Sequence, residues 1–214
     1  MSKNSHWRAS STALSAVTPT KAGRTQVAII EAAIKNYASV GPERTTYETI
    51  ASRCGLSRGI IYKYFSSQQA LFFETVKYIR SNFQKIAIER IKPEHSPLKQ
   101  LSSYIDATFG WLKSYPDHAT IWALFYYYCG LNSSYRKLNT ELVSIGRERI
   151  RAIIEAGKKE GIFHCADSAE AATIIQTAIT GALIALSTEN HKKPRILFEQ
   201  TKRACLAIAS GLTA

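Results

Sequence analysis

The side chains best suited to binding a ligand lie together between residues 45 and 65, where the sequence reads TTYETIASRCGLSRGIIYKYF. Hydroxyl and cationic groups are interleaved there with aromatic rings. Small and basic side chains at the start of a short helix fit the major groove of a nucleic-acid duplex, where Arg, Lys and Tyr hydroxyl groups meet phosphates. The chemistry indicated by this stretch is recognition of a polyanion rather than the making or breaking of bonds.

Two helices joined by a tight turn are needed to position these groups. Ala51 is small enough to let the second helix cross the first closely, and Gly55 can adopt a positive φ in the turn. Leu56 and Ile61 would then bury the inner face of the second helix. The outer face is left with Ser57, Arg58, Gly59, Ile60, Tyr62 and Lys63.

The net charge favours the same kind of partner. Lys and Arg number 28 against 16 Asp and Glu, a formal charge of +12, and residues 1–66 hold nine of the basic residues but only three of the acidic ones. A surplus of this size raises the odds of a nucleic acid or a membrane surface as partner. The 45% hydrophobic content excludes a fully disordered chain, and 11 Gly, 6 Pro and 4 Cys exclude collagen-like and disulfide-rich classes.

The pattern over about residues 24–75 resembles the N-terminal region of the TetR family of transcriptional repressors. That resemblance implies a homodimer whose two recognition helices enter successive major grooves of double-stranded DNA at a palindromic operator. The resemblance rests on Ile30, Ala33, Tyr37, Gly41, Thr45-Thr46, Ile50-Ala51, Gly55-Leu56-Ser57, Gly59, Tyr62 and Tyr64-Phe65. The predicted DNA-binding residues are Arg24, Thr46, Ser57, Arg58, Gly59, Ile60, Tyr62, Lys63, Tyr64 and Gln68.

Two positions depart from the family pattern. Gln68 stands where a phosphate-binding Lys is frequent, so it can donate a hydrogen bond but releases no counterion. Ile60 stands where a small polar residue is common, which favours an apolar contact such as one with a thymine methyl group. Both departures concern affinity and site preference.

The remaining sequence predicts helices throughout, so the expected fold is all-α with about nine helices. Residues 1–20, rich in Ser and Thr, are expected to form a disordered tail. A three-helix helix-turn-helix DNA-binding domain is expected over residues 21–66. A larger helical domain for effector binding and dimerisation is expected over residues 67–214.

A run of aromatic residues between positions 109 and 128 suggests a ligand pocket. Residues 125–128 read FYYY, and four consecutive aromatics cannot all point inward from one helix because each step turns by 100°. Core packing explains most of these rings, and family members commonly bind a small molecule in this domain. The predicted ligand-binding residues, for an unknown effector, are Phe109, Trp111, Tyr115, His118, Trp122, Phe125, Tyr126 and Gln176.

The stretch between Glu170 and Glu189 holds eighteen residues without a charge, which is close to the length of a membrane span. Its threonines and its flanking glutamates favour a helix buried in a soluble protein or oligomer instead. The family resemblance implies that this helix and the last one pair with their symmetry mates as a four-helix bundle. The predicted dimerisation residues are Ile175, Ile179, Ala182, Leu186, Phe198 and Cys205.

The function expected from these features is that of a cytoplasmic, ligand-responsive repressor, not an enzyme, with no membrane partner. The four cysteines form no C-x-x-C pair and the five histidines no metal-binding spacing, so no cofactor and no metal are expected. Three alternatives stay open: a three-helix core element without DNA contact, a helical enzyme, and a basic helical protein that binds a small molecule or a membrane surface without an operator.

Overall fold

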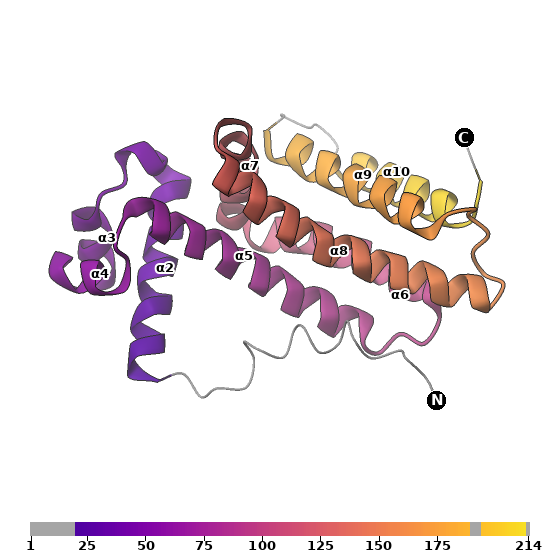
Figure 1. The fold of residues 1–214 in the computed structure, drawn as a ribbon, viewed down its shortest axis with the longest axis horizontal. Coiled ribbons are helices and arrows are strands. Elements are labelled where there is room, and N and C mark those ends of the chain that lie inside the picture. Colours follow the sequence, from indigo (N-terminus) through magenta and orange to yellow (C-terminus); the bar gives the residue numbers. More distant parts are fainter. Residues whose placement is uncertain (1–19, 189–193, 213–214) are drawn as a thin grey trace.

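A computed structural model describes residues 20–188 and 194–212 of the chain, and these residues form nine α-helices and no strand. The prediction of an all-α fold is confirmed. Apart from Thr20, the predicted N-terminal tail lies outside the described residues. The first helices gather at one end of the molecule, coloured indigo in Figure 1: α2 (Lys21–Val40), the 3₁₀ turn η1 (Pro42–Arg44), α3 (Tyr47–Cys54) and α4 (Arg58–Tyr64).

The other helices form a bundle that α5 joins to the first three. α5 runs from the α2–α4 end along the bundle (Figure 1). It packs on α6 and also touches α2, while α8 packs on α9 and α9 on α10. The bounds are α5 (Gln68–Ile91), α6 (Pro97–Ser114), α7 (Pro116–Leu131), α8 (Ser133–Lys159), α9 (Ser168–Thr188) and α10 (Pro194–Ala209).

Local sequence determines where the helices around the turn begin and end. Thr46 caps α3, because its side chain accepts a hydrogen bond from the backbone N–H of Thr49 at 3.3 Å and the Thr49 hydroxyl accepts one from the N–H of Thr46 at 3.1 Å. Thr46 and Thr49 therefore form a capping box at the start of α3. Gly55 ends α3 in the left-handed region (φ 67°), as its place in the turn predicts. Ser57 starts α4 without a side-chain cap, which leaves its hydroxyl exposed.

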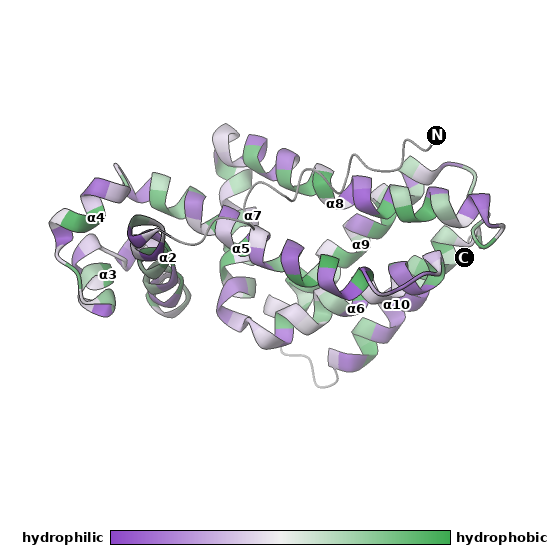
Figure 2. Ribbon diagram, turned by 90° about the horizontal axis from the view of Figure 1, so that it is seen from below, coloured by the Kyte–Doolittle hydropathy of each residue, from purple (hydrophilic) through white to green (hydrophobic). Residues whose placement is uncertain are grey.

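One apolar core runs through the whole molecule. Each helix carries hydrophilic and hydrophobic positions (Figure 2), and the hydrophobic positions face the other helices. Tyr37 of α2 meets Phe72 of α5 edge-on, with ring centroids 5.4 Å apart, so the core of the first helices continues into the bundle. Burying one large side chain of this kind contributes about 1.5–3 kcal/mol.

Gly157 in α8 lies where the chain after the helix turns back. Phe163, 1% exposed, covers it, and a Cβ at position 157 would lie 2.2 Å from Cδ2 and 2.7 Å from Cε2 of that ring. Because carbon atoms in contact are normally about 3.5–4.0 Å apart, only glycine leaves room for the ring. This contact joins the end of α8 to the segment leading into α9.

Among the described residues, α9 is the helix long and apolar enough by composition to cross a membrane. Only 28% of its apolar window is buried within the protomer. The buried side, including Ile175 and Ile179, packs against neighbouring helices, while Ile174 is 46% exposed. Within this chain, α9 is therefore partly exposed rather than buried on all sides.

Candidate nucleic-acid interface and internal cavity

Helix α4 presents a polar outer face, held from beneath by an apolar inner one. Ile61 is fully buried, and Leu56 packs partly buried against the same core. The Tyr47 hydroxyl donates a hydrogen bond to the carbonyl oxygen of Phe65 at 3.0 Å, which fixes the end of α4 against α3. Of the residues that the sequence places on the outer face, Ser57, Arg58, Gly59, Tyr62 and Lys63 are exposed, and Ile60 and Tyr64 are half-buried.

Arg58 is held in place by two neighbours on this face. Its guanidinium pairs with the carboxylate of Glu48 in α3 and donates a hydrogen bond to the hydroxyl of Tyr62 at 3.0 Å. The Tyr62 ring in turn lies edge-on against Tyr47, with centroids 4.6 Å apart. A hydrogen bond with its own backbone N–H, followed by the charge of Arg58, holds the pKa of Glu48 below its usual range. The arginine is thus aimed outward before any ligand arrives.

The remaining predicted DNA-binding residues border this face at the starts of other helices. Thr46 is exposed, and its hydroxyl oxygen accepts the capping hydrogen bond from the N–H of Thr49. Gln68 is exposed in the first turn of α5, where the backbone N–H groups have no acceptor within the helix. Arg24 is exposed in the first turn of α2. Helix N-termini and hydroxyl groups of this kind favour phosphate oxygens.

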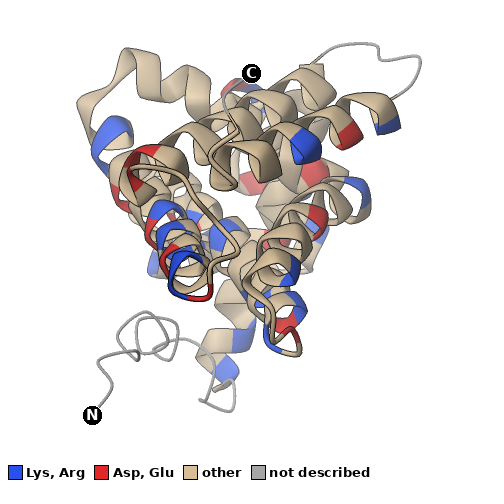
Figure 3. Cartoon of the chain, turned by 90° about the vertical axis from the view of Figure 1, so that its right-hand side faces the viewer, with Lys and Arg blue, Asp and Glu red and all other residues tan. Residues whose placement is uncertain are grey.

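The end of the bundle opposite α2–α4 carries a different distribution of charge. Figure 3 views that end and shows Lys and Arg interspersed with Asp and Glu along the helices. In contrast, the exposed face of α4 has Arg58 and Lys63 and no acidic residue of its own. The face that fits a polyanion is therefore the one formed by α4.

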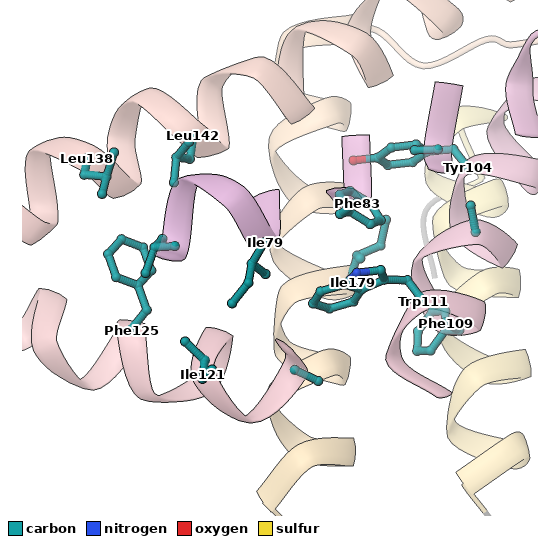
Figure 4. Packing of buried hydrophobic residues seen from close by; sticks show 14 of the residues in the cluster. Ile79, Phe83, Tyr104, Phe109, Trp111, Ile121, Phe125, Leu138, Leu142 and Ile179 are labelled. Atoms are coloured by element: carbon teal, nitrogen blue, oxygen red, sulfur yellow. The ribbon is translucent and has the colours of Figure 1, made fainter. Parts of the chain in front are cut away.

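A cavity lies inside the bundle between α5, α6, α7, α8 and α9. It encloses about 480 Å³ when its opening to solvent is included, and about 30 Å³ of that is wide enough for the centre of a water molecule. Phe83 and Trp111, whose ring centroids are 5.7 Å apart, stand at its wall with Ile179 beside them (Figure 4). The other lining residues are Ile79, Arg80, Tyr104, Thr108, Trp122, Tyr126, Leu142, Val143, Gln176, Thr180 and Leu183.

Half of the residues predicted for a pocket line this cavity, namely Trp111, Trp122, Tyr126 and Gln176. The other four lie elsewhere. Phe109 packs on Phe198 at 4.5 Å between centroids, and Phe125 is fully buried in the core. Tyr115 and His118 stack on each other at 5.1 Å, outside the cavity lining.

The aromatic run in α7 spreads over all sides of the helix, as its 100° steps require. Phe125 enters the core and Tyr126 the cavity, while Tyr127 is 62% exposed. Tyr128 turns toward η1, where its hydroxyl donates a hydrogen bond to Glu43 at 2.8 Å. One helix therefore lines the cavity and contacts the α2–α4 end.

Two more polar contacts tie α2 to the bundle. Lys35 pairs with Asp117 at the start of α7 at 2.6 Å, and the Tyr78 hydroxyl of α5 donates a hydrogen bond to Glu31. His118 lies beside Tyr78, and burial lowers the pKa of its imidazole. The contact between α2 and helices α5 and α7 thus combines charged groups with the buried imidazole of His118.

The residues predicted for dimerisation are mostly inside the protomer. Ile175, Ile179, Ala182 and Cys205 are buried, and Leu186 and Phe198 are half-buried. Four of the six therefore contribute to the core of the chain itself, while Leu186 and Phe198 keep part of their surface open. Different apolar residues of the same two helices face outward, chiefly Ile174 in α9 and Ile196 in α10, which is 49% exposed.

Two arginines beside the cavity were missed from sequence. Arg80 and Arg149 are 8% and 4% exposed. The signal was their spacing, because each continues an inward row of its helix: Val76, Arg80, Phe83 and Ala87 in α5, and Leu142, Gly146, Arg149 and Ile153 in α8. No group of three or more His, Cys, Asp or Glu that could hold a metal occurs in the part of the chain that is described.

Comparison with known proteins agrees with this geometry. Residues 29–75 match the family model of bacterial regulatory proteins of the tetR family. The HTH-type transcriptional repressor NicS of Pseudomonas putida is 28% identical over 151 residues, which cover 67% of this chain and 68% of that protein.

Solved structures share the fold. A TetR transcription regulator from Haloarcula marismortui has a TM-score of 0.77 at 17% identity, covering 87% of this chain and 96% of its own. The regulator FadR from Bacillus subtilis, in complex with stearoyl-CoA, has a TM-score of 0.73 at 21% identity, covering 87% of this chain and 99% of its own. The family model spans the surface built above, including α3, the Gly55 turn and α4. Residues 29–75 thus match the DNA-binding region of the tetR family, and the family model, the relatives and the shared fold together support a TetR-family transcriptional regulator.

Proposed function

We propose that this regulator is a cytoplasmic homodimeric repressor that binds a palindromic operator and is released from it by a small-molecule effector. In this proposal, residues 21–66 bind DNA and residues 67–214 bind the effector and the second subunit. The observation that carries it is α7, whose 16 residues line the cavity at one point and contact η1 at another. A ligand in the cavity acts on the DNA-binding end through that helix.

The DNA contact is tested by the salt dependence of operator binding. The operator would be selected from random DNA. A plot of the logarithm of its binding constant against the logarithm of the salt concentration should have a slope of about −6, for three to four phosphates in each half-site. Because Lys63 occurs once in each subunit, Lys63→Gln should reduce the magnitude of that slope by about 2. Lys159→Gln, an exposed lysine at the end of α8, is the matched control and should leave it unchanged. A slope near zero, with binding to anionic liposomes instead, would refute operator binding.

The proposed interface is the outward face of α9 and α10. Ile174 and Ile196 are both about half exposed there, although each is a large apolar side chain. A partner that covers this face would bury the part of α9 that its own protomer leaves open. Ile174→Glu should therefore give monomers in analytical ultracentrifugation, and these monomers should bind the operator weakly. Leu98→Glu, 43% exposed on α6, is the matched control; dimers that survive Ile174→Glu would move the interface elsewhere.

Release follows from differential affinity of the effector for two arrangements of α7. The wide part of the cavity is small, so a ligand with an apolar body must push Trp122 or Tyr126 outward. Movement of these side chains shifts α7 and weakens the bond between Tyr128 and Glu43. The FadR structure bound to stearoyl-CoA supports a small-molecule site in a protein of this fold. An effector that binds without changing operator affinity would contradict this mechanism.

A further inference from the structure

The strongest unexplained feature of the bundle is a pair of buried arginines. Arg80 of α5 lines the cavity. Arg149 of α8 is not one of the lining residues, but it is buried beside one of them, with its guanidinium 5.9 Å from the centroid of the Tyr104 ring. Burying an ionised group without a counter-charge is costly, so buried arginines in proteins are normally paired. Neither arginine forms an ion pair in the described part of the chain.

Both guanidinium groups also keep unused donors. Arg80 donates one hydrogen bond from Nη2 to the carbonyl oxygen of Leu142 at 3.1 Å, but its buried Nε has no partner among the described residues. The same holds for Nε and Nη1 of Arg149. Burial lowers the pKa of each arginine, and the neighbouring Arg80 charge lowers the pKa of Arg149 further. The site is therefore cationic and incompletely satisfied.

The surrounding residues are arranged so that the cations stay in place. Gly146 of α8 makes room for Arg80 and Gln176, because a Cβ there would lie 3.2 Å from Nη2 of Arg80 and 2.5 Å from Oε1 of Gln176. The Arg149 guanidinium lies 5.9 Å from the centroid of the Tyr104 ring, and that of Arg80 lies 5.2 Å from the centroid of Phe83. These aromatic faces stabilise a positive charge, and the Tyr104 hydroxyl interacts with both guanidinium groups, but Nε of Arg80 and Nε and Nη1 of Arg149 still have no partner among the described residues.

We propose that the effector is an organic carboxylate whose anionic group binds Arg80 and Arg149 while its apolar body lies among the aromatic residues of the cavity. This inference rests on the proposed function, because it concerns the same cavity. An arginine presents two parallel N–H groups to a carboxylate, which satisfies several of the unused donors at once. The walls suit an aromatic or aliphatic body, since Phe83, Trp111 and Trp122 line the same cavity.

The first test compares charged ligands with neutral ones of the same shape on the unmodified protein. The probes are benzoate, phenylacetate, indole-3-acetate and octanoate, each beside its own amide, at constant pH and ionic strength. At least one carboxylate should raise the melting temperature and bind in calorimetry, and its amide should bind roughly 10- to 100-fold more weakly. If no carboxylate binds, or if the amides bind equally well, the inference is overturned.

The second test removes each charge while keeping the volume. Arg80→Met and Arg149→Met should each weaken carboxylate binding roughly 10- to 100-fold. The ligand-free melting temperature should stay equal or rise, because an uncompensated buried charge has been removed. A purely structural role for these arginines predicts a fall instead. Arg90→Met, at an exposed position of the same helix, is the control and should change neither quantity.

Release of operator DNA separates this inference from the proposed function. If carboxylates bind in an arginine-dependent way but leave the operator complex intact, the anion site stands and effector-driven release fails. If an uncharged ligand releases the operator equally well from the wild type and from both methionine variants, release stands and the anion site fails.

Discussion

Substituting Gly157 by alanine adds a single methyl group at the tightest contact found for a glycine of the bundle. The new Cβ would lie 2.2 Å, 2.7 Å and 3.0 Å from three ring carbons of Phe163, so the ring has to move by about 1 Å or more to reach an ordinary contact distance. Phe163 is 1% exposed and has no free space to move into. Alanine should therefore destabilise the fold, although it is the better helix former.

The size of the effect follows from two opposing contributions. Overpacking a core by a methyl group costs about 1–3 kcal/mol, and replacing glycine in a helix gains about 0.5–1 kcal/mol. The net loss is about 1–2 kcal/mol, which for a chain of this length lowers the melting temperature by about 2–8 °C. Circular dichroism melts at a fixed protein concentration measure it, because association would also shift the midpoint.

Gly146→Ala is the matched substitution eleven residues earlier in the same helix. There the nearest atom is the end of the flexible Gln176 side chain, which can rotate away, so stability should change little or rise. Binding in the cavity should fall instead, because Gln176 and Arg80 lose their places. Equal melting temperatures for the Gly157 variant and the wild type would refute the packing argument, and equal losses in both variants would show that glycine itself matters more than its neighbours.

Three further outcomes are expected. Because burial lowers the pKa of His118, the folded state binds a proton at this imidazole less readily than the unfolded state does. The free energy of unfolding should therefore fall as the pH drops below about 6.5. His118→Gln should make that fall smaller, as measured by urea titrations at pH 5.5 and 7.5. Tyr128→Phe keeps the ring but removes the hydrogen bond to Glu43, so the effector should change operator affinity about two- to fivefold less, and an unchanged response in fluorescence anisotropy would remove this bond from the coupling. Glu48→Gln frees Arg58 from its carboxylate, so operator affinity at low salt should rise about two- to fivefold; a fall would mean that Glu48 itself contacts the DNA.

The α2–α4 end could be predicted closely because its structure is determined by local sequence. Thr46 and Gly55 mark helix ends by chemistry that acts within a few residues, and the alternation of apolar and polar positions around Ile61 determines which face of α4 is exposed. Lys63 therefore lies where the sequence indicates.

The bundle was harder to predict because its helices are apolar on several sides. In α9, Ile174 and Ile175 are adjacent and chemically identical, yet one is exposed and the other fully buried. Sequence indicates an apolar helix but not which side the rest of the chain covers, so four of the six residues predicted for dimerisation lie on the inner side. The cavity posed the same problem, since Phe125 and Tyr126 differ only by one 100° step between core and cavity.

The position of Tyr126 and Tyr128 on one helix has a consequence for how such a sensor changes over evolution. Tyr126, which meets the cavity, and Tyr128, which meets η1, are two positions apart, and in the proposed mechanism the helix that carries both transmits movement whatever its cause. Substitutions on the cavity side can alter which compound is sensed and leave the output intact. The product of a duplicated gene could acquire a new inducer in this way while its operator specificity stays the same. The ligand specificity of a biosensor could likewise be changed at Trp122 or Tyr126 while Tyr128 is kept unchanged.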